Sequence, residues 1–202
     1  MTWLALNTTT DRLDLCLGKK EISKEQWILK SIPCARRYAQ DLIPLTINFL
    51  DTHFVSFKDL SGLVVCTGPG SFTGIRIGLA AAQGWSLALN IPCFGVSAFE
   101  YIAHTVSSSK NSLLIMIPTE ESEDAFYVQA LTKGLVPIPG PFKTPKLWEK
   151  GIFDKEDKES YSLVQGDHKS AEALLETSFF MQEKKMECHF QPLYARPSYV
   201  KE

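Results

Sequence analysis

The residues best suited to chemistry lie in a glycine-rich segment, residues 67–78, which reads TGPGSFTGIRIG. A backbone that turns at glycine and then opens a helix presents N–H groups that can hold an anion such as phosphate. Gly68, Gly70, Ser71 and Thr73 are therefore candidate contacts for a nucleotide phosphate. Asn7, at the end of the first apolar segment, is a further candidate, because its amide can hydrogen-bond a water but brings no charge for magnesium.

Three familiar glycine motifs do not fit this segment. A P-loop ends in Gly-Lys followed by Ser or Thr, whereas Gly74 is followed by Ile75. A dinucleotide fingerprint needs G-x-G-x-x-G, and here the last interval is one residue too long. A nucleophile elbow needs glycine two residues before its serine, where Ser71 has Pro69. The misfits favour a second interpretation, a structural turn that lets the following helix pack tightly.

The chain offers no strong metal or catalytic motif. Its histidines, His53, His104, His168 and His189, include no pair four residues apart, the helical spacing of a two-histidine metal site. The adjacent Cys188 and His189 could ligate a metal only together with further residues. We therefore predict neither a catalytic residue nor a metal site.

The glycine-rich segment needs a strand before it and a helix after it. The apolar residues 63–66 predict a buried parallel strand, and residues 73–90 predict the helix, with Ser71 or Thr73 as its N-cap. Residues 35–51 predict a second amphipathic helix with a bend at Pro44. Further strands are expected at residues 2–7, 13–17, 21–29, 93–96, 113–117, 125–131 and 161–164, and further helices at 98–105 and 170–181.

The two long helices carry complementary stripes. Large side chains recur on the first and small ones on the second: Tyr38, Leu42, Leu45 and Phe49, then Gly74, Gly78, Ala81 and Ala82. Such stripes are ordinarily core, but a large face beside a small one also suits an interface with helices of another subunit. Under the interface interpretation, Leu42→Asp or Ala81→Glu should abolish association and leave the monomer folded.

Composition limits the function further. With 202 residues and 45% apolar content, the chain can fold without metal or disulfide support. A net charge of −2 argues against a broad basic surface, so tight binding of nucleic acid by this chain alone is not expected. Five cysteines without a C-x-x-C pair, and the lack of a leader or a membrane-spanning run, predict a reduced, cytoplasmic protein that does not bind membranes.

Several segments together resemble the TsaB family, which takes part in threonylcarbamoyladenosine modification of bacterial tRNA. The run GPGSFTGIRIG carries most of the resemblance, supported by LALNTTT at residues 4–10, QDLIP at 40–44, GVSAFE at 95–100 and PLYAR at 192–196. The resemblance covers most of residues 1–100 well and the remainder loosely. Two positions depart from related sequences: Asn7 stands where aspartate is common, and Tyr38 where histidine is frequent.

The resemblance implies an α/β, actin-like ATPase (ASKHA, ribonuclease H-like) fold with two lobes, residues 1–106 and a reduced lobe at 107–202. It also implies a non-catalytic subunit that pairs through the two helices with TsaD, which transfers threonylcarbamoyl to adenosine 37 of tRNA. TsaE would join a larger complex, the chain alone would form a homodimer, and tRNA would be contacted only through the complex. No cofactor is required, although ATP or ADP could lie at the subunit interface.

Two other functions stay open. An independent nucleotide-dependent transferase or ATPase of the actin-like superfamily would use residues 68–73 and Asn7, and would bind and turn over ATP by itself. A peptidase homologue is less favoured, because the chain lacks both a histidine pair and a nucleophile elbow.

Overall fold

The computed structural model describes residues 1–34, 37–119, 125–140, 143–149, 161–165, 171–187 and 190–193. Sheet A contains β1 (Thr2–Asn7), β2 (Arg12–Lys19), β3 (Ile28–Pro33), β4 (Leu60–Cys66) and β5 (Cys93–Val96). Sheet B contains β6 (Ser112–Pro118), β7 (Ala125–Thr132), β8 (Lys146–Glu149) and β9 (Ser162–Gln165). The helices are α1 (Tyr38–Thr52), α2 (Phe72–Leu89), α3 (Ala98–Thr105) and α5 (Ala171–Glu183), with short 3-10 turns η1 (Lys24–Gln26) and η2 (Phe57–Asp59).

The two sheets share one topology. Sheet A has the order β3-β2-β1-β4-β5, in which β1, β4 and β5 are parallel and β2 is antiparallel to its neighbours. Sheet B has the order β8-β7-β6-β9, with the same directions as the first four strands of sheet A. This repeated order confirms the predicted α/β, actin-like and ribonuclease H-like fold, and among the described residues sheet B has one strand fewer than sheet A.

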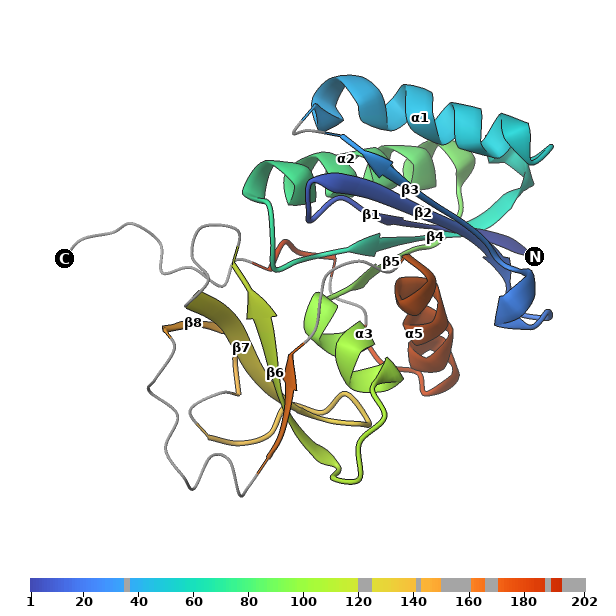
Figure 1. The fold of residues 1–202 in the computed structure, drawn as a ribbon. Helices are drawn as coiled ribbons and strands as arrows, with labels where there is room; N and C mark the ends of the chain where they lie inside the picture. Colours follow the sequence, from blue (N-terminus) through green and yellow to red (C-terminus); the bar gives the residue numbers. More distant parts are fainter. Residues whose placement is uncertain are drawn as a thin grey trace.

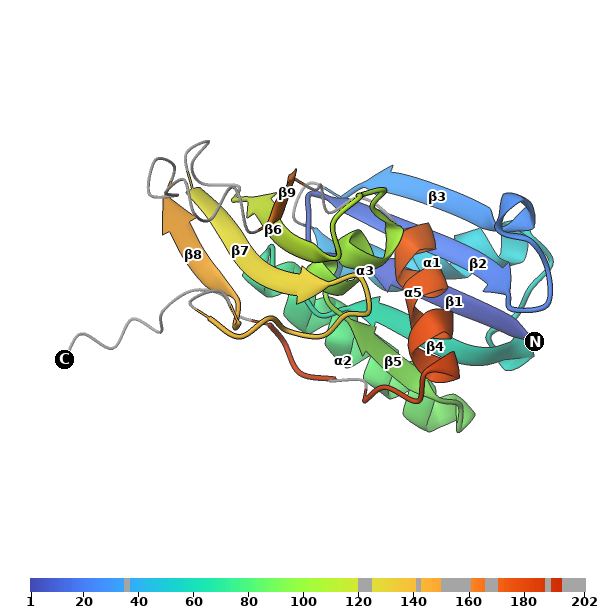
Figure 2. The ribbon, with the colours of Figure 1, turned by 90° about the horizontal axis from the view of Figure 1, so that it is seen from below.

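Helices cover both faces of sheet A. Figure 1 shows α1 and α2 side by side over one face and α5 on the opposite face, and Figure 2 shows α5 crossing the strands from below. Alternate residues of β1 follow this arrangement: Leu4 and Leu6 pack toward α1 and α2, while Trp3 and Ala5 pack toward α5. Because both faces are covered, the residues of β1, β2 and β4 are mostly buried on both sides, whereas those of β3 are largely exposed.

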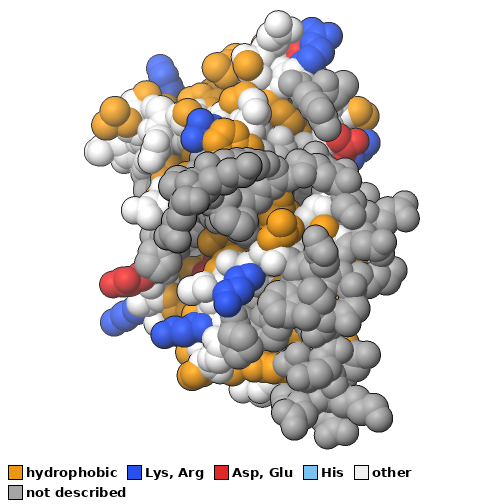
Figure 3. Space-filling model, turned by 90° about the vertical axis from the view of Figure 1, so that its left-hand side faces the viewer, with side chains coloured by type: hydrophobic (Ala, Val, Ile, Leu, Met, Phe, Trp, Pro, Cys, Tyr) orange, Lys and Arg blue, Asp and Glu red, His pale blue; other side chains and the backbone are white. Residues whose placement is uncertain are grey.

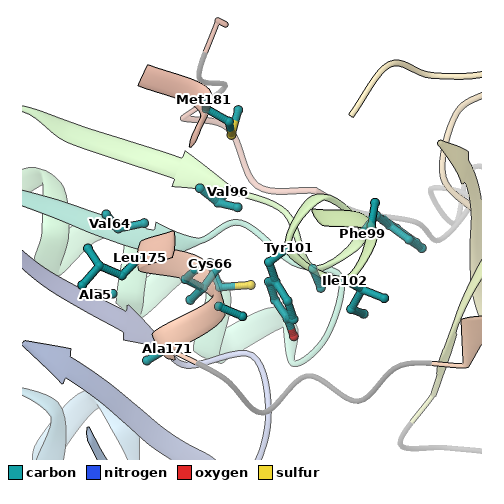
Figure 4. Packing of buried hydrophobic residues seen from close by; sticks show 14 of the residues in the cluster. Ala5, Val64, Cys66, Val96, Phe99, Tyr101, Ile102, Ala171, Leu175 and Met181 are labelled. Atoms are coloured by element: carbon teal, nitrogen blue, oxygen red, sulfur yellow. The ribbon is translucent and has the colours of Figure 1, made fainter. Parts of the chain in front are cut away.

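The core on the α5 side also reaches sheet B. It joins residues of β1, β4 and β5 to α3, α5, β6 and β7. Figure 4 shows this junction, where Val64 and Cys66 of sheet A lie near Leu175 of α5 and Tyr101 of α3. The predicted boundary between lobes falls in the loop from α3 to β6, and its position stays a prediction. No helix among the described residues is both long and apolar enough to cross a membrane.

Most predicted elements are present, and the third strand is the main correction. We expected it at residues 21–29, but that stretch holds η1, and the strand β3 runs over Ile28–Pro33. The Trp27 indole nitrogen donates to the Lys19 carbonyl at 3.2 Å, which helps to hold the turn between β2 and β3. The strand is therefore displaced because the β2–β3 connection is longer than the sequence pattern indicated.

Candidate functional site

The glycine-rich segment follows β4 and opens α2, as predicted. The Ser71 hydroxyl accepts a hydrogen bond from the Gly74 N–H at 3.3 Å, so Ser71 is the N-cap and Thr73 lies within the helix. Gly68 has φ 109° and Gly70 has φ 148°, values that side chains other than glycine rarely adopt. The two glycines thus provide the sharp turn from strand to helix.

The helix glycines allow a close approach of the turn between β1 and β2. A Cβ atom on Gly74 would lie 1.9 Å from the Thr8 carbonyl oxygen, and one on Gly78 would lie 2.2 Å from the Thr8 hydroxyl. The Thr8 hydroxyl in turn donates to the Gly74 carbonyl at 2.8 Å. We expected these small residues to admit a helix of another subunit, but here the chain's own threonine turn occupies that side of α2.

Several backbone groups of the glycine-rich segment are already bonded within the chain. The Ser71 N–H donates to the Thr9 carbonyl at 2.7 Å, and the Gly68 carbonyl accepts from the Ala98 N–H at 2.8 Å. At the first residue of the segment, the Thr67 carbonyl accepts from the Leu193 N–H at 2.7 Å. The Ser71 N–H predicted to face a phosphate is therefore used to join the segment to the threonine turn.

Asn7 belongs to the same cluster and is fully buried. Its Oδ1 accepts hydrogen bonds from the Thr9 N–H at 3.0 Å and from the Thr9 hydroxyl at 2.7 Å. These bonds form an Asx-type turn, in which the side chain replaces a backbone partner. The structure thus brings Asn7, Gly68, Gly70 and Ser71 together, with Thr73 exposed at the start of α2, but the contacts shown within this cluster are structural.

Tyr38 closes the other side of the threonine turn. Its hydroxyl lies 2.5 Å from the Thr10 carbonyl oxygen and 2.7 Å from that of Arg12, and it donates toward both. The side chain is 2% exposed. The residue that stands in place of histidine therefore fixes the start of β2 from within the core.

Sequence reasoning missed one buried acid. Asp14, which is not among the predicted site residues, is 3% exposed and lies opposite Asn7 in the β1–β2 pair. The Ser31 hydroxyl donates to Asp14 Oδ1, and Arg12 Nε donates to that hydroxyl at 2.7 Å. The burial of Asp14 was missed because a strand with alternating polar and apolar residues suggests one solvated face, whereas both faces of sheet A are covered. The only sequence signal was Cys16, an apolar residue on the supposedly exposed side.

The predicted interface residues are largely core residues, which is a correction. Leu42 and Phe49 are 2% exposed, like Tyr38, and they pack with Ala82 between α1, α2 and sheet A. Only Leu45 and Ala81 of that predicted set are half-buried. The stripes identified the faces by which the helices pack on their own sheet. Leu42→Asp would therefore unfold the monomer rather than test an interface.

A different set of residues lies on the solvent side of the two helices. We call it the outer face: Ile43 and Ile47 on α1, with Ala80, Gly84 and Leu87 on α2. A Cβ atom on Gly84 would meet no atom within 4 Å. The outer face thus presents large apolar side chains on α1, and small residues together with Leu87 on α2.

One cleft of about 480 Å³ lies between α3, α5 and β9, away from the glycine-rich segment. Its polar lining includes Lys24, Thr105, Gln165, Glu172 and Glu176, and Lys24 forms an ion pair with Glu176 at 3.5 Å. None of the residues predicted to contact a nucleotide lines this cleft.

No group of three or more His, Cys, Asp or Glu side chains within the described ranges could hold a metal ion, and Cys188 and His189 lie outside those ranges. Burial raises the pKa of the Cys66 thiol to about 12, and burial followed by the charge of Glu172 raises that of Cys16 to about 12. Such thiols are poor nucleophiles at neutral pH, because the thiolate is the reactive form.

Comparison with known proteins shows that the chain is similar to proteins named for threonylcarbamoyladenosine biosynthesis. The family profile described as TsaD, tRNA N6-adenosine threonylcarbamoyltransferase, matches residues 32–118. The tRNA threonylcarbamoyladenosine biosynthesis protein TsaB of Escherichia coli is 34% identical over 103 residues, 51% of this chain and 43% of that protein. TsaB of Bacillus subtilis is 31% identical over 103 residues, 51% of this chain and 44% of that protein. The matches thus span less than half the length of these relatives.

Solved structures extend the similarity of fold over nearly the whole chain. An uncharacterized Pseudomonas aeruginosa protein with similarity to peptidase YeaZ superposes with a TM-score of 0.72 at 20% identity, covering 96% of this chain and 99% of that one. YeaZ from Pseudomonas aeruginosa superposes with a TM-score of 0.63 at 20% identity, covering 92% and 95%. The chain is thus similar in sequence to TsaB proteins over about half of its length, and it shares the fold of the YeaZ structures over nearly all of it.

Proposed function

We propose that this chain is a non-catalytic subunit that binds and supports a TsaD-type transferase in forming threonylcarbamoyladenosine at adenosine 37 of tRNA. The observation that carries the proposal is the packing of the glycine-rich segment. Backbone and side-chain atoms of Thr8 and Thr9 occupy the space beside Gly70, Gly74 and Gly78. A phosphate-binding loop would leave such space open for its ligand. Among the glycine-rich segment's two interpretations, this packing supports the structural one.

The outer face supports a role in binding another subunit. Ile43 is 53% exposed and Leu87 is 86% exposed, yet both belong to helices that are otherwise well packed. Ridges of large side chains beside a groove of small residues suit packing against helices of a partner. We propose that TsaD binds this face, and that the chain forms a homodimer through the same face when TsaD is absent.

Other members of the system follow from the same proposal. TsaE would join the larger complex, ATP or ADP could lie at the boundary between subunits, and the complex would act in the cytoplasm. The described Lys and Arg side chains on the face in Figure 3 lie at several separate places, and the chain has a net charge of −2. This distribution supports contact with tRNA through the complex rather than by this chain alone.

The test is to mix the purified chain with TsaD of the same organism and measure the mass of the species by light scattering after size exclusion. We expect a defined mixed complex, and a homodimer from this chain alone. Ile43→Glu and Gly84→Glu should each weaken the complex about tenfold or more, because a charge would be desolvated in a packed helix face. Both sites are exposed, so the monomer should stay folded by circular dichroism.

Leu163→Glu is the matched control, because Leu163 is 43% exposed on β9 rather than on the outer face. It should bind TsaD as the unchanged chain does. Separate elution of the two proteins without nucleotide, with ADP and with ATP would contradict the proposal. ATP binding and turnover by the isolated chain would then favour the independent enzyme.

A further inference from the structure

The end of α1 carries an aromatic residue in an unfavourable backbone conformation. The Val55 N–H donates to the Leu50 carbonyl and the Phe54 N–H to the Asp51 carbonyl, each at 3.0 Å, which is the Schellman pattern of helix termination. Phe54, at the position after the cap residue His53, has φ 56°. This position usually holds glycine or asparagine, since a side chain crowds the backbone there.

Among the described residues, no contact of the Phe54 ring offsets the strain. It is 98% exposed, while the neighbouring Val55 turns inward and packs against the core beneath α1. At the end of α2 the same left-handed conformation is held by Asn90, with φ 52°, a residue that tolerates it. Neither backbone preference nor burial within the monomer therefore explains phenylalanine at position 54.

The support of Phe54 is rigid and belongs to the helix pair. The Phe57 ring lies 5.1 Å from the Trp85 ring of α2, which fixes the segment after α1 against the second half of that helix. Ser56 and Asp59 form a reciprocal capping box, with the Asp59 carboxylate accepting from the Ser56 N–H at 2.7 Å. An exposed ring on such a support loses little conformational freedom when it enters a partner's pocket.

The charges around Phe54 indicate the kind of pocket that fits it. Asp51 and Asp59 are exposed on either side, with Lys58 as the nearby cation. The last turn of α1 contains no Lys or Arg, and at this end the His53 ring places its Nδ1 2.7 Å from the Phe49 carbonyl oxygen. A pocket with basic groups at its rim would complement this end, whereas a second copy of the chain would bring the same acidic groups against it.

We propose that Phe54 is an anchor of the interface with the TsaD-type subunit, where its ring enters an apolar pocket with basic groups at the rim. This inference rests on the proposed function. It adds Phe54 to the outer face as a further contact with the same partner. Buried aromatic anchors commonly account for much of the affinity of an interface.

The test measures stability and binding of the full chain together. Phe54→Gly should raise the melting temperature by about 2–4 °C, because glycine relieves the backbone strain. The same change should weaken the complex with TsaD about tenfold or more. Phe54→Ala should weaken the complex equally without the rise in melting temperature, since alanine keeps the strained conformation and loses only the ring.

Lys185→Gly is the matched control. Lys185 has φ 53° and is exposed beyond the end of α5, on the opposite side of sheet A from the helix pair. It should raise the melting temperature in the same way and leave TsaD binding unchanged.

The outcomes separate this inference from the proposed function. If the unchanged chain binds TsaD and Phe54→Gly binds equally well, the anchor is wrong and the proposed function stands. If Phe54→Gly disrupts only the homodimer, a second copy is the occupant and the inference is also overturned. If the unchanged chain does not bind TsaD at all, the proposed function itself fails.

Discussion

At the residue scale, the spacing between Gly74 and Thr8 decides how closely α2 can lie against the turn from β1 to β2. The Thr8 carbonyl occupies the space that a Gly74 side chain would need, and the Thr8 hydroxyl bonds the Gly74 carbonyl at 2.8 Å. Gly84, three turns later on the same helix, faces open space. The two glycines therefore have opposite roles in stability although both are helical.

Gly74→Ala should lower the free energy of unfolding by about 1–3 kcal/mol, because the new methyl group must push the threonine turn away. Gly84→Ala should raise it by about 0.5–1 kcal/mol through better helix propensity alone. Urea titration of the two variants beside the unchanged chain measures both effects. Equal stabilisation by the two substitutions would show that α2 does not pack on Thr8 as described.

The buried thiol of Cys66 makes stability depend on alkaline pH. Its pKa is raised by burial from the usual 9.0 to about 12, so the folded chain keeps the proton that the unfolded chain releases. Stability from this group is complete below pH 9 and falls as pH rises from about 9 toward 12. Cys66→Ala should make that decline shallower, as measured by urea titration at pH 8 and pH 10; an unchanged slope would contradict the assignment.

At the scale of elements, sequence patterns identified what depends on neighbours along the chain. The apolar run of β4, the Ser71 cap and the length of α2 all follow from local preferences, and all three are present. The position of β3 could not be derived in this way, because the length of its connection depends on contacts such as the Trp27 indole bonding to Lys19. Local patterns define elements better than the turns that join them.

The candidate site shows the same limit. The small residues of α2 predicted a close approach, but the approaching group is Thr8, 66 residues earlier in the chain, and no local pattern names it. The stripe of large side chains on α1 also did not reveal which side of the helix would face solvent. Leu42 was therefore predicted at an interface, although it is a core residue. Exposure of Ile43 and Phe54 could be seen only once the helices were placed on the sheet.

At the scale of the whole molecule, the two sheets are held by one continuous core. Phe179 of α5 packs edge-on against Trp3 of β1 at 5.6 Å and against Trp27 at 5.9 Å. Its neighbours in the same core include residues of α3, β6 and β7. We therefore expect sheet A and sheet B to unfold together.

Phe179→Ala should lower the free energy of unfolding by about 3–5 kcal/mol, because it leaves a cavity at the junction of three aromatic rings. In the unchanged chain and in the variant alike, tryptophan fluorescence and far-ultraviolet circular dichroism should agree with each other on the urea midpoint, although the midpoint itself is lower in the variant. Two separate midpoints in the variant would mean that the sheets are independent units, in keeping with a clean division near residue 106.

The position of α5 has a consequence for how the chain is made. The apolar face of sheet A that α5 covers is complete once β5 has formed, yet α5 itself comes after all of sheet B in the chain. A nascent chain whose emerged part ends with β9 would still expose this face to solvent. Exposed apolar surface of this kind is prone to aggregate or to bind chaperones. Ribosome-bound chains stalled after β9 should accordingly be more sensitive to protease in sheet A than chains stalled after α5 has emerged.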